Sequence, residues 1–547
     1  MINIKNFSIN TLILKMILYF SGLGYLLYNF ILYNKSNWIF LIVQFICFIL
    51  IGYYIKKFMN YKFSVFISVI SFLLSLLVIK INFIEFYEIL LNSYRIKTIF
   101  YSLNIPLNVC VLFIAISISL LATTYLFFII NFLYNWLINI FKKYIKVTRN
   151  EWIVIMLISV FLIIFCFVIF SLSDVFYSNK YLYNYIYSSD SPWHLQNNTV
   201  WINMNHTEND LRQPLFAIFS LPLIGPFYLF ANLFGSGSLV YAFIINIPQI
   251  ILLVVSCYMI TRILDIKTFK IKILILIILS LSYPVLLFSF MMEQYIIAVF
   301  YLLIYVYISI NNNKSNELFL IASSGTLLTS GFLFFLSFRR PLFRKENLKK
   351  FISTFLLGLS CIMIFGNQTI FQTFIQKVDL FSSYTNVNIS ILDKLFQFFS
   401  FVGSCFFAPP ARIDFSIINQ VSWQMSNSHL FTIVGIIILV ISLLGFCVSH
   451  KQKNSQICLL WVFFSFILLF LIGWGSTENA MVLYSLYFGW AYFILIVQFL
   501  RYILKKINIS FHSLKIAYIF LVFVLFSYNG MEIFKLVVDF AHVYYPI

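Results

Sequence analysis

The chain has 547 residues, of which 62% are hydrophobic and only 10% are charged. A soluble protein of this length needs many more charged residues to cover its surface, so the composition excludes a soluble globular enzyme. The formal net charge of +19 does not indicate nucleic-acid binding. Lys and Arg lie in clusters between apolar runs, and no soluble segment carries a basic stripe with interleaved aromatic residues.

Apolar runs recur from end to end, each long enough to cross a hydrocarbon core of roughly 30 Å. The first run, near residues 11–33, is too long for the apolar part of a signal peptide, so we expect an uncleaved first span. The sequence predicts an all-α, polytopic helical membrane protein. Its transmembrane helices, about 13, are expected at residues 11–33, 37–55, 63–82, 106–134, 152–173, 239–262, 273–291, 294–311, 351–372, 430–449, 456–474, 480–500 and 515–533.

Three further apolar stretches do not fit simple crossings. Residues 214–234 hold three prolines, which suit short interfacial helices on the outer face better than a straight span. Residues 317–338 begin and end near basic residues and carry Thr, Ser and Gly in the middle, which predicts a broken, re-entrant hairpin. The third stretch is 395–408.

The distribution of charge predicts the topology. With a cytoplasmic N-terminus, and with residues 214–234 not crossing the membrane, 26 of the 36 Lys and Arg residues face the cytoplasm and 13 of the 17 Asp and Glu residues face outward. This is the bias expected from the positive-inside rule. We therefore expect an integral protein of a bacterial inner or plasma membrane, with a large outer loop at residues 174–238.

The most polar part of this loop contains Asp190, within the segment SSDSPWHL. The serines and the proline favour a turn that holds the carboxylate just above the membrane. A carboxylate in such a place can act as a general base. A solvated aspartate that caps a short helix fits the same residues, so both interpretations stay open.

Potential metal ligands in the chain match no known ligand spacing. The eight cysteines lie within or at the edge of apolar runs and form no CxxC pair. The loop residues show no helical motif such as HExxH, so ordinary loop polarity explains them as well as a metal site does. The sequence leaves the cofactor unknown: it does not indicate a divalent metal and does not exclude one. The loop residues concerned are His194, His206, Glu208 and Asp210.

Two glutamates lie at the predicted outer ends of spans. Glu293 stands between two apolar runs with almost no loop, and ionisable groups at membrane level are often functional. Glu478 precedes a span that carries Tyr484 and Trp490 near its start. A glutamate in a tight outer turn, or one favoured by a helix dipole, fits these positions equally well.

Two arginines, Arg212 and Arg412, lie on the predicted acidic outer face. A ligand that carries a phosphate would need such partners. Ion pairs with the neighbouring Asp210 and Asp414 are the alternative.

The order of these features resembles the GT-C-fold membrane glycosyltransferases, the class of the protein O-mannosyltransferases and the lipid A aminoarabinose transferase. In that class a core span leads into a large outer loop with a catalytic acid, followed by an HPPLYYLLLALFFKLFG-like segment. Here RQPLFAIFSLPLIGPFYLFANLFGSGS takes that place, and MITRILDIK, SLSYPVLLFSF and GTLLTSGFLFF follow. The likeness covers about residues 150–345. It departs from the class at Arg212-Gln213, where the class has His, and at Asp190, which is single instead of paired.

The resemblance implies a polyprenyl-phosphate sugar donor and transfer, on the outer face, to a lipid-linked glycan, a polysaccharide or a protein. Asp190 would be the general base and Glu293 would assist it or orient the acceptor. Attack opposite the leaving phosphate would invert the anomeric centre, with the leaving phosphate stabilised by Arg212 or Arg412. The substrate-binding residues implied by this likeness are His194, Arg212, Arg412 and Glu478.

The same likeness divides the chain into three regions. Residues 1–150 would hold four additional transmembrane helices, residues 151–345 a GT-C-like catalytic core with the outer loop 174–238, and residues 346–547 the C-terminal transmembrane helices. The last region would carry outer loops at 373–429 and 475–479.

Two other functions remain open: a transporter or flippase of lipid-linked sugars, and a polysaccharide polymerase or ligase. Transporters place ionisable residues at mid-membrane and often show internal repeats. This chain shows no convincing repeat, and its acidic residues cluster at the outer edge. A polymerase or ligase would be expected to rely on outer arginines and histidines, which are few here.

Overall fold

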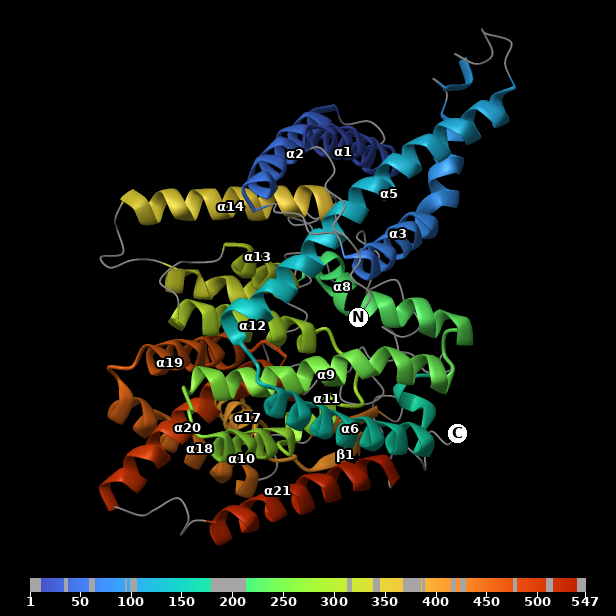
Figure 1. Ribbon diagram of the computed structural model, residues 1–547. Helices are drawn as coiled ribbons and strands as arrows, with labels where there is room; N and C mark the ends of the chain where they lie inside the picture. Colours follow the sequence, from blue (N-terminus) through green and yellow to red (C-terminus); the bar gives the residue numbers. More distant parts are fainter. Residues whose placement is uncertain are drawn as a thin grey trace.

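The computed structural model confirms an all-α integral membrane protein (Figure 1). Ten of the described helices are long and apolar enough to cross a membrane by length and composition, and three are shorter apolar helices. The structure describes residues 11–33, 38–58, 64–93, 96–98, 106–178, 213–311, 317–337, 345–366, 385, 389–414, 420–423, 429–475, 480–507 and 515–538.

Each predicted span corresponds to a helix or to a pair of helical segments. The continuous helices are α1 (Thr11–Tyr33), α2 (Trp38–Phe58), α3 (Val65–Asn92), α5 (Leu107–Ile140), α6 (Arg149–Leu172), α9 (Leu239–Ile263), α12 (Tyr295–Asn311), α14 (Lys345–Phe365), α18 (His429–Ser449) and α21 (Lys515–Lys535). The composite spans are α10 (Phe269–Ser280) with α11 (Tyr283–Phe288), α19 (Lys453–Ser465) with η6 (Phe466–Leu471), and η7 (Ala480–Tyr484) with α20 (Ser485–Ile507).

The predicted broken hairpin is present as α13 (Glu317–Thr326) followed by the 3-10 segment η5 (Leu328–Ser337). Its turn contacts the start of another element, because the backbone N–H of Leu215 donates to the Gly325 carbonyl at 2.8 Å. The Tyr305 hydroxyl donates to the Leu333 carbonyl at 3.2 Å. The hairpin is thus buried in protein, which is where broken membrane helices are tolerated.

Residues 214–234 differ from the prediction of short interfacial helices. They form one helix, α8 (Phe216–Ala231), which continues through Pro222 and Pro226 and ends in the short turn η4 (Asn232–Phe234). Most of α8 is buried against α3, α5, α9 and α13. Its burial explains the difference, because neighbouring helices can support a proline-containing helix that would be unstable alone.

The N-terminal helices pack together and against α14 in the upper part of Figure 1. Gln44 of α2 donates to the Met363 carbonyl at 3.3 Å, and Asn29 of α1 donates to the Ile364 carbonyl at 3.4 Å. Helices α6, α9, α18, α20 and α21 form the lower part of the view. The third apolar stretch forms α17 (Ile391–Ser404), and β1 (Ala411–Asp414) pairs antiparallel with β2 (Gln420–Trp423).

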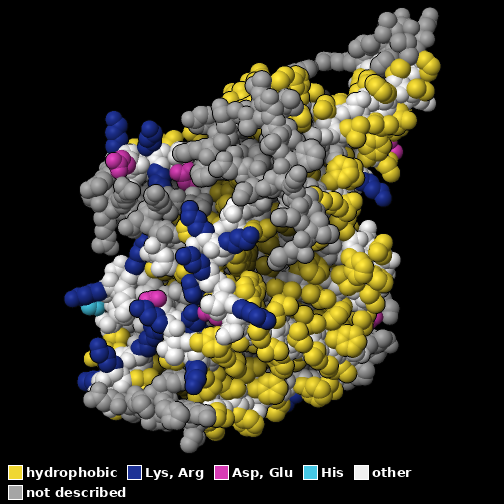
Figure 2. Space-filling view, in the orientation of Figure 1, with side chains coloured by type: hydrophobic (Ala, Val, Ile, Leu, Met, Phe, Trp, Pro, Cys, Tyr) yellow, Lys and Arg dark blue, Asp and Glu magenta, His cyan; other side chains and the backbone are white. Residues whose placement is uncertain are grey.

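Hydrogen bonds bring many basic residues to one end of the bundle. Lys272 contacts Glu151 at 2.7 Å, and the Arg501 guanidinium donates to the Leu264 carbonyl at 2.9 Å. The Lys453 ammonium donates to the Ser309 carbonyl. Figure 2 shows Lys and Arg gathered on the left of the molecule, beside a broad hydrophobic surface. We call this part the basic end, formed by residues 141–151, 262–272, 307–311, 450–455 and 501–507.

Candidate functional site at the acidic end

The opposite end of the bundle contains two buried carboxylates. We call it the acidic end and define it by residues 173–178, 289–295 and 480–484. The C-terminal end of α6 and the N-terminal end of α12 lie at this acidic end. The side chains of Asp174 and Glu293 are 5% and 3% exposed there.

Glu293 lies in the tight turn between α11 and α12. This turn forms because the Met291 N–H donates to the Leu287 carbonyl at 3.1 Å and the Ile296 N–H donates to the Glu293 carbonyl at 3.4 Å. The preceding residues, Met291 and Met292, are fully buried. Ionisable side chains at the end of a membrane span are rare and often functional, which marks Glu293 as a functional candidate.

Asp174 follows α6 directly, in the short 3-10 turn η2 (Asp174–Phe176). The Ser173 hydroxyl accepts a hydrogen bond from the Val175 N–H at 3.4 Å and caps this turn. The Phe176 ring contacts the Phe290 ring edge-on, with centroids 5.1 Å apart. The two segments that carry the buried acids are therefore packed against each other.

Tyr177 adds a phenol beside Asp174. Its backbone N–H donates to the Asp174 carbonyl at 3.1 Å. Burial, with a further contribution from the Asp174 charge, raises the pKa of Tyr177. The phenol therefore stays protonated well beyond neutral pH and can donate a hydrogen bond to a phosphate or hydroxyl group.

Asn246 of α9 fixes the Glu293 turn to the bundle. Its Nδ2 donates to the Ser289 carbonyl at 2.6 Å and lies 3.1 Å from the Cys166 sulfur of α6. Asn246 is fully buried. A buried hydrogen bond of this kind between helices helps to hold the turn in one position.

Aromatic side chains border the turn on its other side. The Tyr295 and Tyr484 rings are 5.6 Å apart, and Trp474 Nε1 donates to the Tyr484 hydroxyl at 2.6 Å. Trp474 also forms an antiparallel bridge with Thr385. Tyr and Trp favour the membrane interface, which agrees with a position of this end near the lipid headgroups.

Only one of the predicted site residues has a described side chain. It is Glu293, and the structure places it in the predicted turn. Arg412 belongs to β1, where it pairs with Ser422, but its side chain is not among those described. Four others lie outside the described residues: Asp190, His194, Arg212 and Glu478.

Sequence reasoning missed Asp174. It stands at the junction between an apolar run and a polar loop, where an aspartate resembles ordinary loop polarity. The signal that was available is the short apolar continuation Val175-Phe176, which lets the chain fold back onto the bundle. Among the described residues, no group of three or more His, Cys, Asp or Glu could hold a metal ion.

Comparisons with protein-family models, with curated proteins and with solved structures find no match to this chain.

Proposed function

We propose that the chain is a membrane glycosyltransferase that uses a polyprenyl-phosphate sugar donor and acts at its acidic end. The observation that carries this proposal is the buried Glu293 in a tight turn, on a segment that packs through Phe290 and Phe176 against the segment of a second buried acid, Asp174. Transfer to a hydroxyl group requires carboxylates that accept a proton or orient the acceptor. Carboxylates fixed at membrane level can perform this role where the acceptor hydroxyl meets a donor that is carried by a lipid.

The division of labour follows the likeness to GT-C enzymes. Asp190, predicted from the sequence, is the general base that removes the proton from the acceptor hydroxyl. Glu293 orients that hydroxyl. The acceptor oxygen attacks the anomeric carbon as the bond to the polyprenyl phosphate breaks, and the configuration inverts. Arg212 or Arg412 balances the charge of the departing phosphate.

Tyr177 supports this assignment because it offers a neutral donor next to the acids. A lysine or arginine in its place would pair with Asp174 and neutralise it. A protonated phenol can donate a hydrogen bond to a sugar hydroxyl or a phosphate oxygen without forming an ion pair with Asp174.

The test uses purified full-length protein in detergent with a panel of radiolabelled polyprenyl-phosphate sugars and a membrane-lipid extract as the acceptor. Transfer of label to the extract, with release of polyprenyl phosphate, is the expected result. A panel in which no donor is consumed, while labelled lipid crosses reconstituted bilayers, would replace the enzyme with a flippase.

A further inference from the structure

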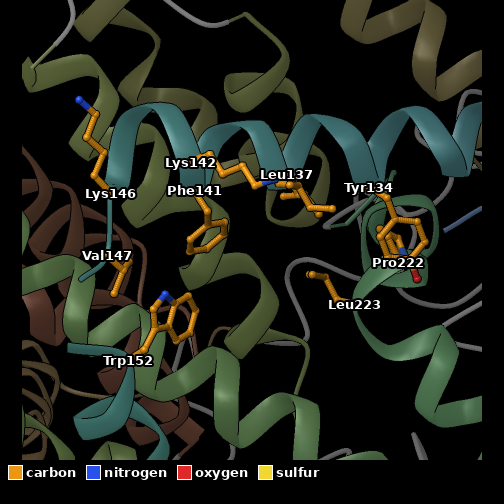
Figure 3. Close-up of a pocket in the computed structure, with 10 residues that line it drawn as sticks. Tyr134, Leu137, Phe141, Lys142, Lys146, Val147, Trp152, Pro222 and Leu223 are labelled. Carbon is orange, nitrogen blue, oxygen red and sulfur yellow. The ribbon is translucent and has the colours of Figure 1, made fainter. Parts of the chain in front are cut away.

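A cavity of about 600 Å³ lies at the basic end, between the C-terminal end of α5, the linker to α6 and the middle of α8 (Figure 3). Its size is typical of small-molecule sites, which span roughly 300–1,000 Å³. In Figure 3 the Lys142 side chain runs along α5 towards Leu137, whereas the Lys146 side chain lies at the other end, near Val147, and extends away from the cavity. Apolar and aromatic side chains form the rest of the wall, among them Leu137, Phe141, Trp152 and Leu223.

The two lysines give the cavity a positive charge, since none of the described residues that line it is acidic. Both are exposed, and neither forms an ion pair with any residue that the structure describes. The nearest carboxylate in sequence, Glu151, is engaged elsewhere. It contacts Lys272 at 2.7 Å and accepts the Thr148 N–H at 2.8 Å. The lysines are therefore available for an anion.

The backbone at the cavity is unusual. The last turn of α5 widens into the π-helical segment η1 (Phe141–Ile145), and the chain then turns at Lys146 with φ of 47°. This left-handed region favours glycine, so a lysine here is strained. Strained residues and π-turns are found disproportionately at ligand sites.

The linker that carries the lysines is fixed in place. The Tyr307 hydroxyl of α12 donates to the Tyr144 carbonyl at 3.3 Å. Thr148 and Glu151 form a reciprocal capping box at the start of α6. Since Glu151 also contacts Lys272 of α10, three helices hold the linker and the cavity is formed before any ligand arrives.

The cavity opens beside the lipid-facing surface. Trp152 lines it and is 38% exposed, and the same helix exposes Leu157 at 64%. Figure 2 shows the hydrophobic surface meeting the Lys and Arg side chains in this part of the molecule. An apolar cavity with cations at its mouth, at the end of a span, fits a lipid with a negatively charged headgroup.

We propose that this cavity binds one anionic glycerophospholipid, whose phosphate is held by Lys142 and whose acyl chain lies along Leu137, Phe141 and Leu223, with Lys146 adding positive charge at the rim. A glycerophospholipid fits better than the polyprenyl-phosphate donor, because the cavity lies at the end opposite the buried acids. Anionic lipids are enriched at the cytoplasmic surface, which the basic end is predicted to face. The proposal holds whether or not the chain transfers sugars.

The test is native mass spectrometry of the full-length protein in detergent, titrated with phosphatidylglycerol, phosphatidylcholine or polyprenyl phosphate. We expect the first phosphatidylglycerol to bind about 10-fold more tightly than phosphatidylcholine. The double variant Lys142→Gln with Lys146→Gly should lose this preference. The single variant Lys146→Gly relieves the left-handed strain, so it should fold as well as the parent while its binding weakens.

Lys143→Gln is the matched control. Lys143 is also exposed on η1, but it lies over the Tyr144 ring at 5.5 Å and does not line the cavity. The control should keep the preference for phosphatidylglycerol. The proposal is overturned if the double variant keeps that preference, if Lys143→Gln loses it equally, or if polyprenyl phosphate displaces phosphatidylglycerol at equal concentration.

Discussion

Two buried carboxylates, Glu151 and Glu293, occupy opposite ends of the bundle and serve different purposes. Glu151 has a structural role: it caps α6 and neutralises Lys272, which is 13% exposed. Glu293 is held in a turn that its neighbours fix through the backbone and through Asn246. The contacts of Glu151 fit a stabilising residue, and those of Glu293 fit a residue positioned for chemistry.

Replacing Glu151 with Gln should destabilise the protein by about 3 kcal/mol, because the change leaves the largely buried Lys272 without its anion. Thermal unfolding in detergent measures this. Glu532→Gln is the control: its ion pair with Lys535 is 2.9 Å long, but Lys535 is 48% exposed, so the loss should stay below about 0.5 kcal/mol. Equal effects of the two variants would show that Lys272 does not depend on Glu151.

Replacing Tyr177 with Phe should lower sugar transfer about 10-fold and leave folding intact, because one donor to a charged group is lost. The pH dependence follows from the raised pKa of Tyr177. Since the phenol is protonated below its usual pKa near 10 and its pKa in the folded protein is higher still, the donor persists through pH 9. The role would be contradicted if the rate of the parent falls between pH 7 and 9 while the rate of Tyr177→Phe does not.

At the level of the elements, glycines allow close packing of helices around α18. A Cβ at Gly445 would overlap the Leu495 carbonyl of α20, and one at Gly435 would overlap the Phe399 carbonyl of α17. Small residues at such crossings let backbones approach within the membrane. Replacement of either glycine by a larger residue would therefore force the two helices apart.

Gly445→Ala should therefore destabilise the protein by about 1–3 kcal/mol. Gly530→Ala on α21 is the matched control, because a Cβ there meets nothing within 4 Å. That control should be neutral or stabilise the helix by up to about 1 kcal/mol. Comparison of their unfolding temperatures decides the matter: if Gly445→Ala is as stable as the control, the predicted clash is absent.

The spans could be predicted because hydrophobic length alone determines them. The break between α10 and α11 was not predicted, although Ser282 and Pro284 mark it. The prolines of α8 favour short interfacial helices by local pattern, but the burial of α8 against four other helices depends on tertiary packing that no local pattern reveals. The cavity beside Lys142 could not be predicted either, because it forms only where α8 packs against the end of α5.

At the level of the whole molecule, the structure brings together the helix ends whose basic clusters the charge pattern assigns to the cytoplasmic side. Helix α5 ends where α6 begins, and Arg501 at the C-terminal part of α20 reaches Leu264 after α9. The sequence could predict this alternation from its basic clusters. It could find Glu293 from its isolation between apolar runs, but not Asp174, whose burial depends on the contact between Phe176 and Phe290.

We predict that the basic end faces the cytoplasm. In a cysteine-free variant, Lys143→Cys should react with a membrane-impermeant maleimide only in inside-out vesicles. Ser236→Cys, exposed just before α9 at the other end, should react only in right-side-out vesicles. The reverse pattern would turn the proposed active site towards the cytoplasm.

The most direct test of the account is the rate of sugar transfer from the donor that the parent protein uses, compared between Glu293→Gln and Glu532→Gln. Both variants remove one acid, but only Glu293 lies in the turn beside Asp174. We predict that Glu293→Gln lowers the rate at least about 100-fold with folding intact, whereas Glu532→Gln keeps it. Equal rates for both variants would contradict a catalytic site at the acidic end.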